Sequence, residues 1–344
     1  MSDVENDTPT NGNGKRVNAL ELGPRKKGSK QDPLVHHGRH FCRTIHAMCN
    51  IHALLTQSII REVEETLDED LTTGERHEHK IFKELLKTVP NLEERVMTGS
   101  EEDLADIADL LRKGASGARG DDTKTLKGNI LEWITPKGQS LNPPLYRNQK
   151  VDRGFHHDRT GALLCPVDLD WSNEDVKTKL RSGEESVTGD RWPIFLYAEY
   201  KYDHEDPWNG LLRSDILVKH VFTSPSSVDK DPKATRSGNA RLHNMTRSTP
   251  ASLAYIATQV RFALSSSSVF SRTDIITDSE RFYNSLLEIL DDPAEKQEVD
   301  SLLKWWNRKI FPSATQAPSI ASSNWASTRI REKRAASGNN SRVD

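Results

Sequence analysis

A run of basic residues between positions 223 and 250 has the strongest potential for binding chemistry in this sequence. It carries five Lys or Arg residues against two Asp residues, together with one histidine. Its Ser, Gly and Asn residues allow backbone N–H groups to face outward, and it leads into an apolar helix whose amino end favours an anion. We therefore predict a site for a phosphate of nucleic acid or of a nucleotide, formed by Lys233, Arg236, Arg241, His243 and Arg247. The alternative is a loop whose Arg side chains pair with carboxylates elsewhere on the chain.

A second chemical possibility is a nuclease-type pattern at Glu199 and Lys201. In metal-dependent nucleases, a Glu-x-Lys pair ends a strand, where the carboxylate holds Mg²⁺ and the lysine stabilises the scissile phosphate. An upstream aspartate is also required, and Asp170 is the candidate, although Asp168 and Asp190 are available too. Because the motif is so short, we favour a solvent-facing ion pair as its explanation.

Side chains of the zinc-binding types gather near the start of the chain, at Cys42, His46, Cys49 and His52. On one straight helix, Cys42 and His52 would be about 15 Å apart along the axis. The ligands of one zinc ion lie about 2 Å from the metal, so such a site would need His156 or Cys165 from elsewhere. We favour buried, hydrogen-bonded core residues.

His156 and Asp158 have the spacing of two ligands in the iron site of 2-oxoglutarate oxygenases, with His220 or His243 as a possible third ligand. That chemistry needs its last histidine on a barrel strand, whereas His220 lies on a predicted helix and His243 shortly precedes one. We favour a turn network of Asp and Arg side chains here, and we predict no cofactor.

The element that must position the basic run is a helix predicted at residues 249–264. Thr249 is suited to the N-cap, and Pro250 is suited to the first helical position because its missing N–H costs nothing there. Apolar residues recur at helical spacing and also occupy most of the remaining faces. The helix is therefore predicted to be buried on most sides.

The other elements follow from apolar periodicity and capping signals. Helices are predicted at residues 39–67, 74–88, 101–113, 123–134, 172–180 and 206–222, and after capping boxes at residues 277–280 and 292–295. Gly114 is predicted to end the third helix. Residues 193–200 are predicted as a strand, with a buried helix start as the alternative, and residues 136–170 as a long loop that forms or covers a site. We predict a mainly α, single helical domain with at most a minor strand element.

The two ends of the chain differ in composition from its middle. Residues 1–33 and 312–344 lack apolar periodicity and are rich in Asn, Gly, Ser, Lys and Arg, so we predict disordered tails around a helical domain at residues 34–311. The tails contain six Lys or Arg against five Asp or Glu, and five against two. Because the whole chain has a net charge of -3, the domain carries about -7. Any contact with nucleic acid must come from a local patch or from the tails.

Cysteine usage and hydropathy bear on the compartment. Three cysteines in 344 residues argue against a disulfide framework, the amino end has no apolar signal region, and no apolar run is long enough to span a membrane. We predict an intracellular protein without a membrane partner. Basic residues at 25–27 and 329–334 have the composition of nuclear import signals, with solvated charge as the alternative, so the compartment is nuclear or cytoplasmic.

Several short sequence motifs between residues 112 and 312 are distinctive. They are DDTKTLKG at 121–128, GFHHDRTGALLCP at 154–166, DPWNGL at 206–211, TRSGNAR at 235–241 and RFYNS at 281–285. Together with residues 41–55, they resemble a family of uncharacterised proteins that basidiomycete fungi encode in many copies and that is defined by a domain of unknown function. The resemblance implies a fungal origin and one co-folded unit. It supplies no activity, cofactor or catalytic residue.

Two hypotheses follow for the function. The favoured one is a non-enzymatic interaction protein whose basic loop around residues 236–247 binds an anionic partner such as nucleic acid. The other is a metal-dependent enzyme acting on nucleic acid, with Glu199, Lys201 and an upstream aspartate at its centre. Binding that weakens with salt, without turnover, would support the first, and Mg²⁺-dependent nicking would support the second.

Overall fold

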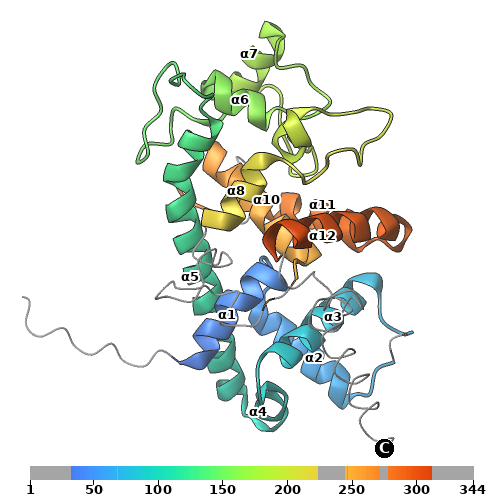
Figure 1. The fold of residues 1–344 in the computed structure, drawn as a ribbon. Coiled ribbons are helices and arrows are strands. Elements are labelled where there is room, and N and C mark those ends of the chain that lie inside the picture. Colours follow the sequence, from blue (N-terminus) through green and yellow to red (C-terminus); the bar gives the residue numbers. More distant parts are fainter. Residues whose placement is uncertain (1–31, 68, 224–244, 246, 272–277, 312–344) are drawn as a thin grey trace, which may run out of the picture. The chain divides into compact units, whose positions relative to one another are not determined.

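The structure, a computed structural model, describes residues 32–67, 69–223, 245, 247–271 and 278–311, the side chains of 221–223 excepted. The helices belong to a compact unit that begins at Pro33 (Figure 1). They are α1 (Pro33–Thr44), α2 (Ile51–Val63), α3 (Thr73–Thr88), α4 (Leu92–Thr98), α5 (Glu101–Ile134), α6 (Asp158–Leu164), α7 (Glu174–Ser182), α8 (Asp215–Thr223), α10 (Pro250–Leu264), α11 (Ser279–Asp291) and α12 (Lys296–Ile310). Short 3-10 turns are η1 (Gly154–His156), η2 (Ile194–Leu196), η3 (Ala198–Tyr200) and η4 (Pro293–Glu295). Within the described ranges, β structure is limited to two isolated bridges, so the predicted mainly α class is confirmed.

Helix α10 is the buried centre of the packing, as predicted. It begins with Thr249 as N-cap in a capping box with Ser252, followed by Pro250. Thirteen of its fifteen residues are buried, which leaves no wet face. It packs against α1, α5, α8 and α11, and Figure 1 shows it between these helices. Its all-round apolar composition is therefore matched by neighbours on every side.

Helix α5 is one continuous helix of 34 residues, so the predicted end at Gly114 and the break before residue 123 are wrong. Gly114 instead allows α1 to approach closely, because a Cβ there would lie 2.1 Å from the carbonyl oxygen of Val35. Gly38 of α1 makes the reciprocal approach, and its Cβ would lie 2.1 Å from the carbonyl oxygen of Leu111. Glycine inside a helix costs about 1 kcal/mol relative to alanine, and the packing of the two backbones offsets that cost.

The helix predicted at residues 39–67 is two helices, α1 and α2, joined by a turn. At the end of α1, the N–H groups of Ile45 and His46 both donate to the carbonyl oxygen of Phe41, at 2.9 and 3.1 Å. Asn50 then caps α2 by accepting from the N–H of Ala53. The apolar spacing continued through the turn because Met48 is buried there, and spacing alone did not reveal the change of direction.

The strand predicted at residues 193–200 is also wrong. This segment forms η2 and η3, and Glu199 and Tyr200 have φ angles of 54° and 57°. It meets other segments at two isolated bridges, between Pro193 and Pro166 and between Tyr197 and Leu211. Phe195 and Leu196 are nevertheless buried, so the aromatic and branched residues that suggested a strand serve the core from turns.

The other predicted helix boundaries are partly confirmed and partly wrong. Helix α3 agrees with its prediction, and α7 begins after Asn173, whose side chain accepts from the N–H of Asp175. The helix predicted from residue 206 begins only at Asp215, and the long loop predicted at residues 136–170 contains α6. Asp278 precedes α11 without a side-chain capping bond, and Thr277 of the predicted capping box lies outside the described residues.

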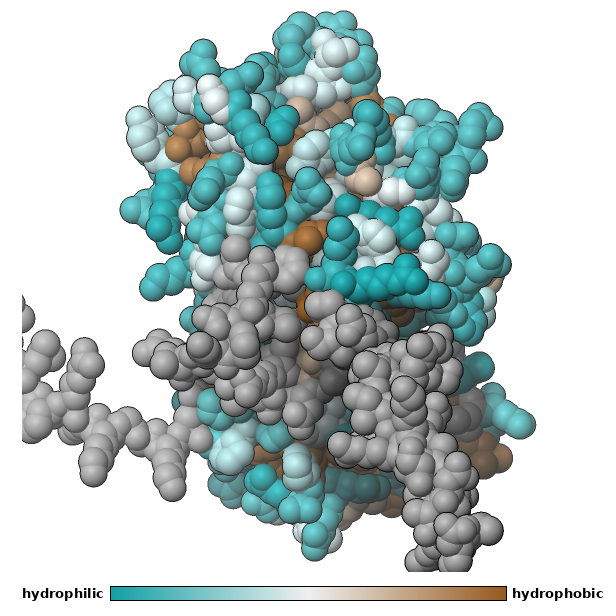
Figure 2. All heavy atoms as spheres, viewed as in Figure 1, coloured by the Kyte–Doolittle hydropathy of each residue, from teal (hydrophilic) through white to brown (hydrophobic). Residues whose placement is uncertain are grey.

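No helix in the described part of the chain could cross a membrane. Figure 2 shows mainly hydrophilic residues on the described part of one face, with hydrophobic ones in small separate areas.

Candidate anion-binding site

The amino end of α10 opens onto a pocket of about 350 Å³. Residues of α1, α3 and α11 form its other walls. Its ionisable lining residues are His40, His77, Lys80, Glu84, Arg247 and Asp291. The pocket therefore lies where the sequence predicted an anion site, and it combines basic and acidic groups.

The first turn of α10 uses most of its own N–H groups. The N–H of Ser252 donates to Oγ1 of Thr249 at 3.1 Å, and the N–H of Leu253 donates to the carbonyl oxygen of Thr249 at 3.2 Å. Thr249 Oγ1 itself donates to the carbonyl oxygen of Thr44 at 2.7 Å, which fixes α10 against α1. Pro250 has no N–H, so Ala251 provides the one N–H of this turn that has no hydrogen bond to the described residues. A ligand would meet the dipole of the helix end with one backbone donor.

The carboxylates of the pocket have partners of their own. Asp291 lies 3.5 Å from Nζ of Lys80 and 3.9 Å from Nδ1 of His77. Glu84 pairs with Lys87 at 2.7 Å. Arg247 is exposed, and it forms no ion pair with a carboxylate of the described ranges. The charge left over at this end of α10 is therefore positive.

The structure describes one of the five residues predicted for the anion site, and that residue, Arg247, lines the pocket. Lys233, Arg236, Arg241 and His243 lie outside the described residues. Lys80, His77 and His40 were not predicted, because they belong to α1 and α3, far away in the sequence. One indication of these three residues was present in the sequence, which is that each lies next to the predicted buried face of its helix.

The residues of the nuclease pattern lie on the surface. Glu199 and Lys201 form an ion pair of 2.9 Å, with side chains 77% and 78% exposed. That pair lowers the pKa of Glu199, chiefly through the hydrogen bond from Lys201. Asp170 is engaged in a turn, where its oxygens accept from the N–H and the hydroxyl of Ser172 at 2.8 and 2.7 Å. The ion pair and the turn thus account for the positions of these residues without a bound metal ion.

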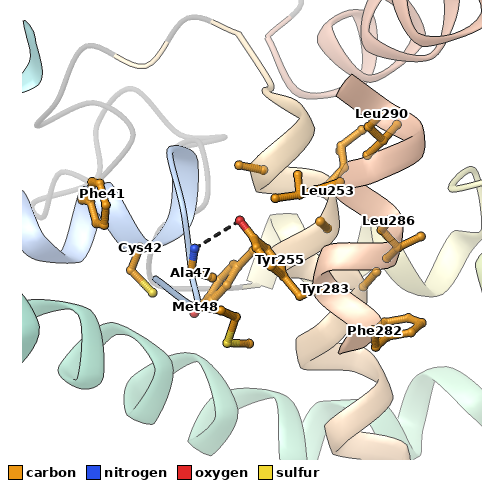
Figure 3. Close-up of a cluster of buried hydrophobic side chains, with 14 of the residues drawn as sticks. Phe41, Cys42, Ala47, Met48, Leu253, Tyr255, Phe282, Tyr283, Leu286 and Leu290 are labelled. Atoms are coloured by element: carbon orange, nitrogen blue, oxygen red, sulfur yellow. Dashed lines mark hydrogen bonds between the residues drawn. The ribbon is translucent and has the colours of Figure 1, made fainter. Parts of the chain in front are cut away.

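The cysteines and histidines proposed as metal ligands each have their own contacts in the structure. Cys42 is buried in α1, where burial raises the pKa of its thiol, and Arg119 lies 3.6 Å from its sulfur. His46 lies in the turn after α1, and its Nδ1 accepts from the N–H of Met48. Cys49 is partly buried in the same turn. Figure 3 shows Cys42, Ala47 and Met48 beside the rings of Tyr255 and Tyr283. These contacts are those of core residues.

The two residues of the iron-type pair lie in two consecutive elements. His156 ends η1, whereas Asp158 starts α6 and pairs with Arg181 at 2.8 Å. Within the part of the chain that the structure describes, no three His, Cys, Asp or Glu side chains are grouped so that they could hold a metal ion.

The core also contains a buried ionic cluster that the sequence patterns did not predict. Arg43 donates two hydrogen bonds of 2.8 Å to the carboxylate of Asp122, and the hydroxyl of Tyr255 donates to the same carboxylate at 2.7 Å. Burial alone would raise the pKa of Asp122, but the hydrogen bond and charge of Arg43 hold it below its usual value. His220 is buried nearby, and desolvation lowers its pKa to about 4. One signal was present: Asp122 lies four residues from Ala118 and Leu126 on the buried face of α5.

This cluster brings together buried side chains of four helices. Arg43 comes from α1, Asp122 from α5, His220 from α8 and Tyr255 from α10. A buried charge that lost its partner would be strongly destabilising, so α1 and α5 depend on each other through Arg43 and Asp122. The cluster is closed to ligands, since Asp122 is 0% and Arg43 5% exposed. Its role is to fix the packing around α10.

Comparison with known proteins gives a family for more than half of the chain. A family model described as a family of unknown function, DUF6698, matches residues 113–311. Searches of curated proteins and of solved structures returned no match. The matched region includes most of α5, all of α10 and Asp122 of the buried cluster.

Proposed function

The chain belongs to the family of unknown function DUF6698, and we propose that it is a binding module, not an enzyme, with a site for an anionic partner at the amino end of α10. The observation that carries the proposal is Arg247, exposed and without a described carboxylate partner, in a pocket that opens at this helix end. The positive end of the helix dipole and the N–H of Ala251 add to its attraction for an anion.

The proposed partner is nucleic acid, which would place a phosphate in the pocket. The folded part of the chain is acidic as a whole, so repulsion would confine the contact to this local patch. Lys233, Arg236, Arg241 and His243, outside the described residues, precede Arg247 in the sequence and would extend the contact along the phosphate backbone. Few phosphate contacts imply modest affinity with a clear dependence on salt.

The test is binding of a fluorescently labelled oligonucleotide by the full chain, measured by anisotropy over a series of salt concentrations. Arg247→Ala should weaken binding and reduce the magnitude of the salt slope by about one. Lys179→Ala is the matched control, because Lys179 is an exposed cation on α7 that lines neither this pocket nor its rim. The proposal fails if the wild-type chain does not bind at low salt, or if the two variants bind alike.

The nuclease alternative has no comparable support in the geometry of Glu199, Lys201 and Asp170. It can be tested with the same protein, by incubating supercoiled DNA with Mg²⁺. Nicking that disappears in Glu199→Ala would overturn the binding-module proposal in favour of an enzyme.

We also propose, from the sequence, a fungal and intracellular protein whose basic segments at residues 25–27 and 329–334 direct nuclear import. Both segments lie outside the described residues. Fluorescent fusions with and without these segments would test the import proposal, which fails if their deletion leaves the distribution unchanged.

A further inference from the structure

A second pocket lies at the opposite end of α10, beside α5. It has a volume of about 830 Å³, and its lining includes Phe262 of α10 and Phe270. Four cationic side chains line it, Arg119, Lys124, Lys127 and Arg147, and none of the described lining residues is a carboxylate. It shares no lining residue with the pocket at the amino end of α10.

The positive charge of this second pocket is not neutralised by the described residues. Arg119 donates to the carbonyl oxygen of Ala47 at 3.0 Å, and Lys127 donates to that of Ser268 at 3.1 Å, so both are held by neutral acceptors. Lys124 and Arg147 are exposed, and neither has an ion pair with a described carboxylate. The acidic residues nearest to Lys124 in the sequence are already engaged, since Asp121 pairs with Arg39 and Asp122 with Arg43.

Two further cations contact residues of the pocket lining and add to its positive field. Lys150 is buried, donates to the carbonyl oxygen of Phe262 at 2.5 Å and lies 3.5 Å from the centre of the Phe262 ring. Arg153 is fully buried and donates to the carbonyl oxygens of Ala263 and Lys127 at 2.8 and 2.9 Å. The bonds to Phe262 and Ala263 satisfy carbonyls in the last turn of α10, where the helix dipole favours cations. Burial lowers the pKa of Arg153 to about 10, so it stays charged at neutral pH.

We propose that this pocket binds a small phosphorylated ligand. Lys124 and Arg147 would reach the phosphate groups from two sides, with Arg119 and Lys127 at the floor, and the rest of the ligand would lie against Phe270. One guanidinium group can donate two parallel hydrogen bonds to phosphate oxygens, and a lysine ammonium group adds a point charge. The volume is in the range of known ligand sites. Ser116, Thr123 and Asn148 offer neutral polar groups around the same opening.

The experiment is titration calorimetry of the full chain with inorganic triphosphate, ATP and adenosine as separate probes. Triphosphate and ATP should bind, and adenosine should bind much more weakly. The double variant Lys124→Glu/Arg147→Glu should raise the Kd for triphosphate at least about tenfold, because two charge-assisted contacts become repulsive. Lys179→Glu, a charge reversal on an exposed lysine of α7, should leave the Kd unchanged. If the double variant loses the native circular dichroism, Arg147→Ala, at an exposed position, replaces it.

The probes also identify the ligand class within the proposal. Tighter binding of ATP than of triphosphate, lost in Phe270→Ala, would support a nucleotide, whereas equal binding would support a ligand recognised through its phosphates alone. The proposal is overturned if neither phosphate compound binds, if the charge reversals have no effect, or if only long nucleic acid binds. Arg247→Ala tests the other end of α10 and should leave triphosphate binding unchanged, so the two sites can fail separately.

Discussion

Replacing His220 with glutamine should remove a pH dependence from the stability of this fold. His220 is 2% exposed, and burial lowers its pKa from 6.5 to about 4, with the charge of Asp122 opposing the shift and that of Arg43 adding to it. Between these two pH values the unfolded chain binds a proton at His220 that the folded chain does not. Stability therefore rises with pH over this window and is lost as the pH falls through it.

The size of the effect follows from the shift. Each pH unit within the window is worth about 1.4 kcal/mol, so the full shift corresponds to about 3 kcal/mol, and lowering the pH from 7.5 to 5 should cost the wild-type chain about 2 kcal/mol through this group. Urea denaturation at the two pH values measures it, as the difference between wild type and His220→Gln. His52→Gln, at an exposed position of α2, is the matched control and should keep the wild-type pH dependence.

Two results would refute this reasoning. One is an equal loss of stability at low pH in the wild type and in His220→Gln. The other is an NMR titration in which the His220 ring of the folded protein takes up its proton near pH 6.5. The NMR measurement needs no variant, so it remains decisive even if His220→Gln is too unstable to study.

Two further predictions concern close packing around α1. Gly114→Ala should destabilise the fold by about 1 to 3 kcal/mol, because its Cβ would collide with the carbonyl oxygen of Val35. Gly120→Ala on the same helix has open space around its Cβ and should be neutral or stabilising by up to about 1 kcal/mol, and equal effects of the two changes in urea denaturation would contradict the close crossing. Tyr283→Phe should cost about 1 to 3 kcal/mol, because the N–H of Ala47 would lose the acceptor that lies 3.1 Å away (Figure 3). Tyr146→Phe, at a residue 60% exposed, should leave the melting temperature unchanged, and a Tyr283→Phe protein as stable as this control would show that the bond contributes nothing.

Local sequence was enough to predict an element when that element depends on its own residues. The start of α10 was predicted from Thr249 and Pro250, and in the structure Ser252 completes a capping box with Thr249. The burial of α10 follows from its composition, because a helix that is apolar on all faces can be stable only when it is surrounded. The position of Arg247 beside that helix end is a consequence of chain connectivity.

Predictions failed where a distant segment decides the local structure. Glycine often follows the end of a helix, but at Gly114 α1 occupies the space beside it and the helix continues. Residues 193–200 had the composition of a strand, but in the described structure their β pairing is limited to two isolated bridges, of Pro193 with Pro166 and of Tyr197 with Leu211. A strand is stabilised by neighbours that its own sequence does not specify.

The sequence by itself therefore determined that this chain is mainly helical, that residues 250–264 form its buried centre, and that an arginine lies at the amino end of that helix. Only the tertiary structure decided which charges are neutralised. Asp122 meets Arg43 from 79 residues away and becomes part of the core, whereas Arg119, Lys124 and Arg147 come together beside α5 with no described carboxylate partner. Charge compensation depends on distance in space, and that distance is set by how the helices pack, not by their spacing along the chain.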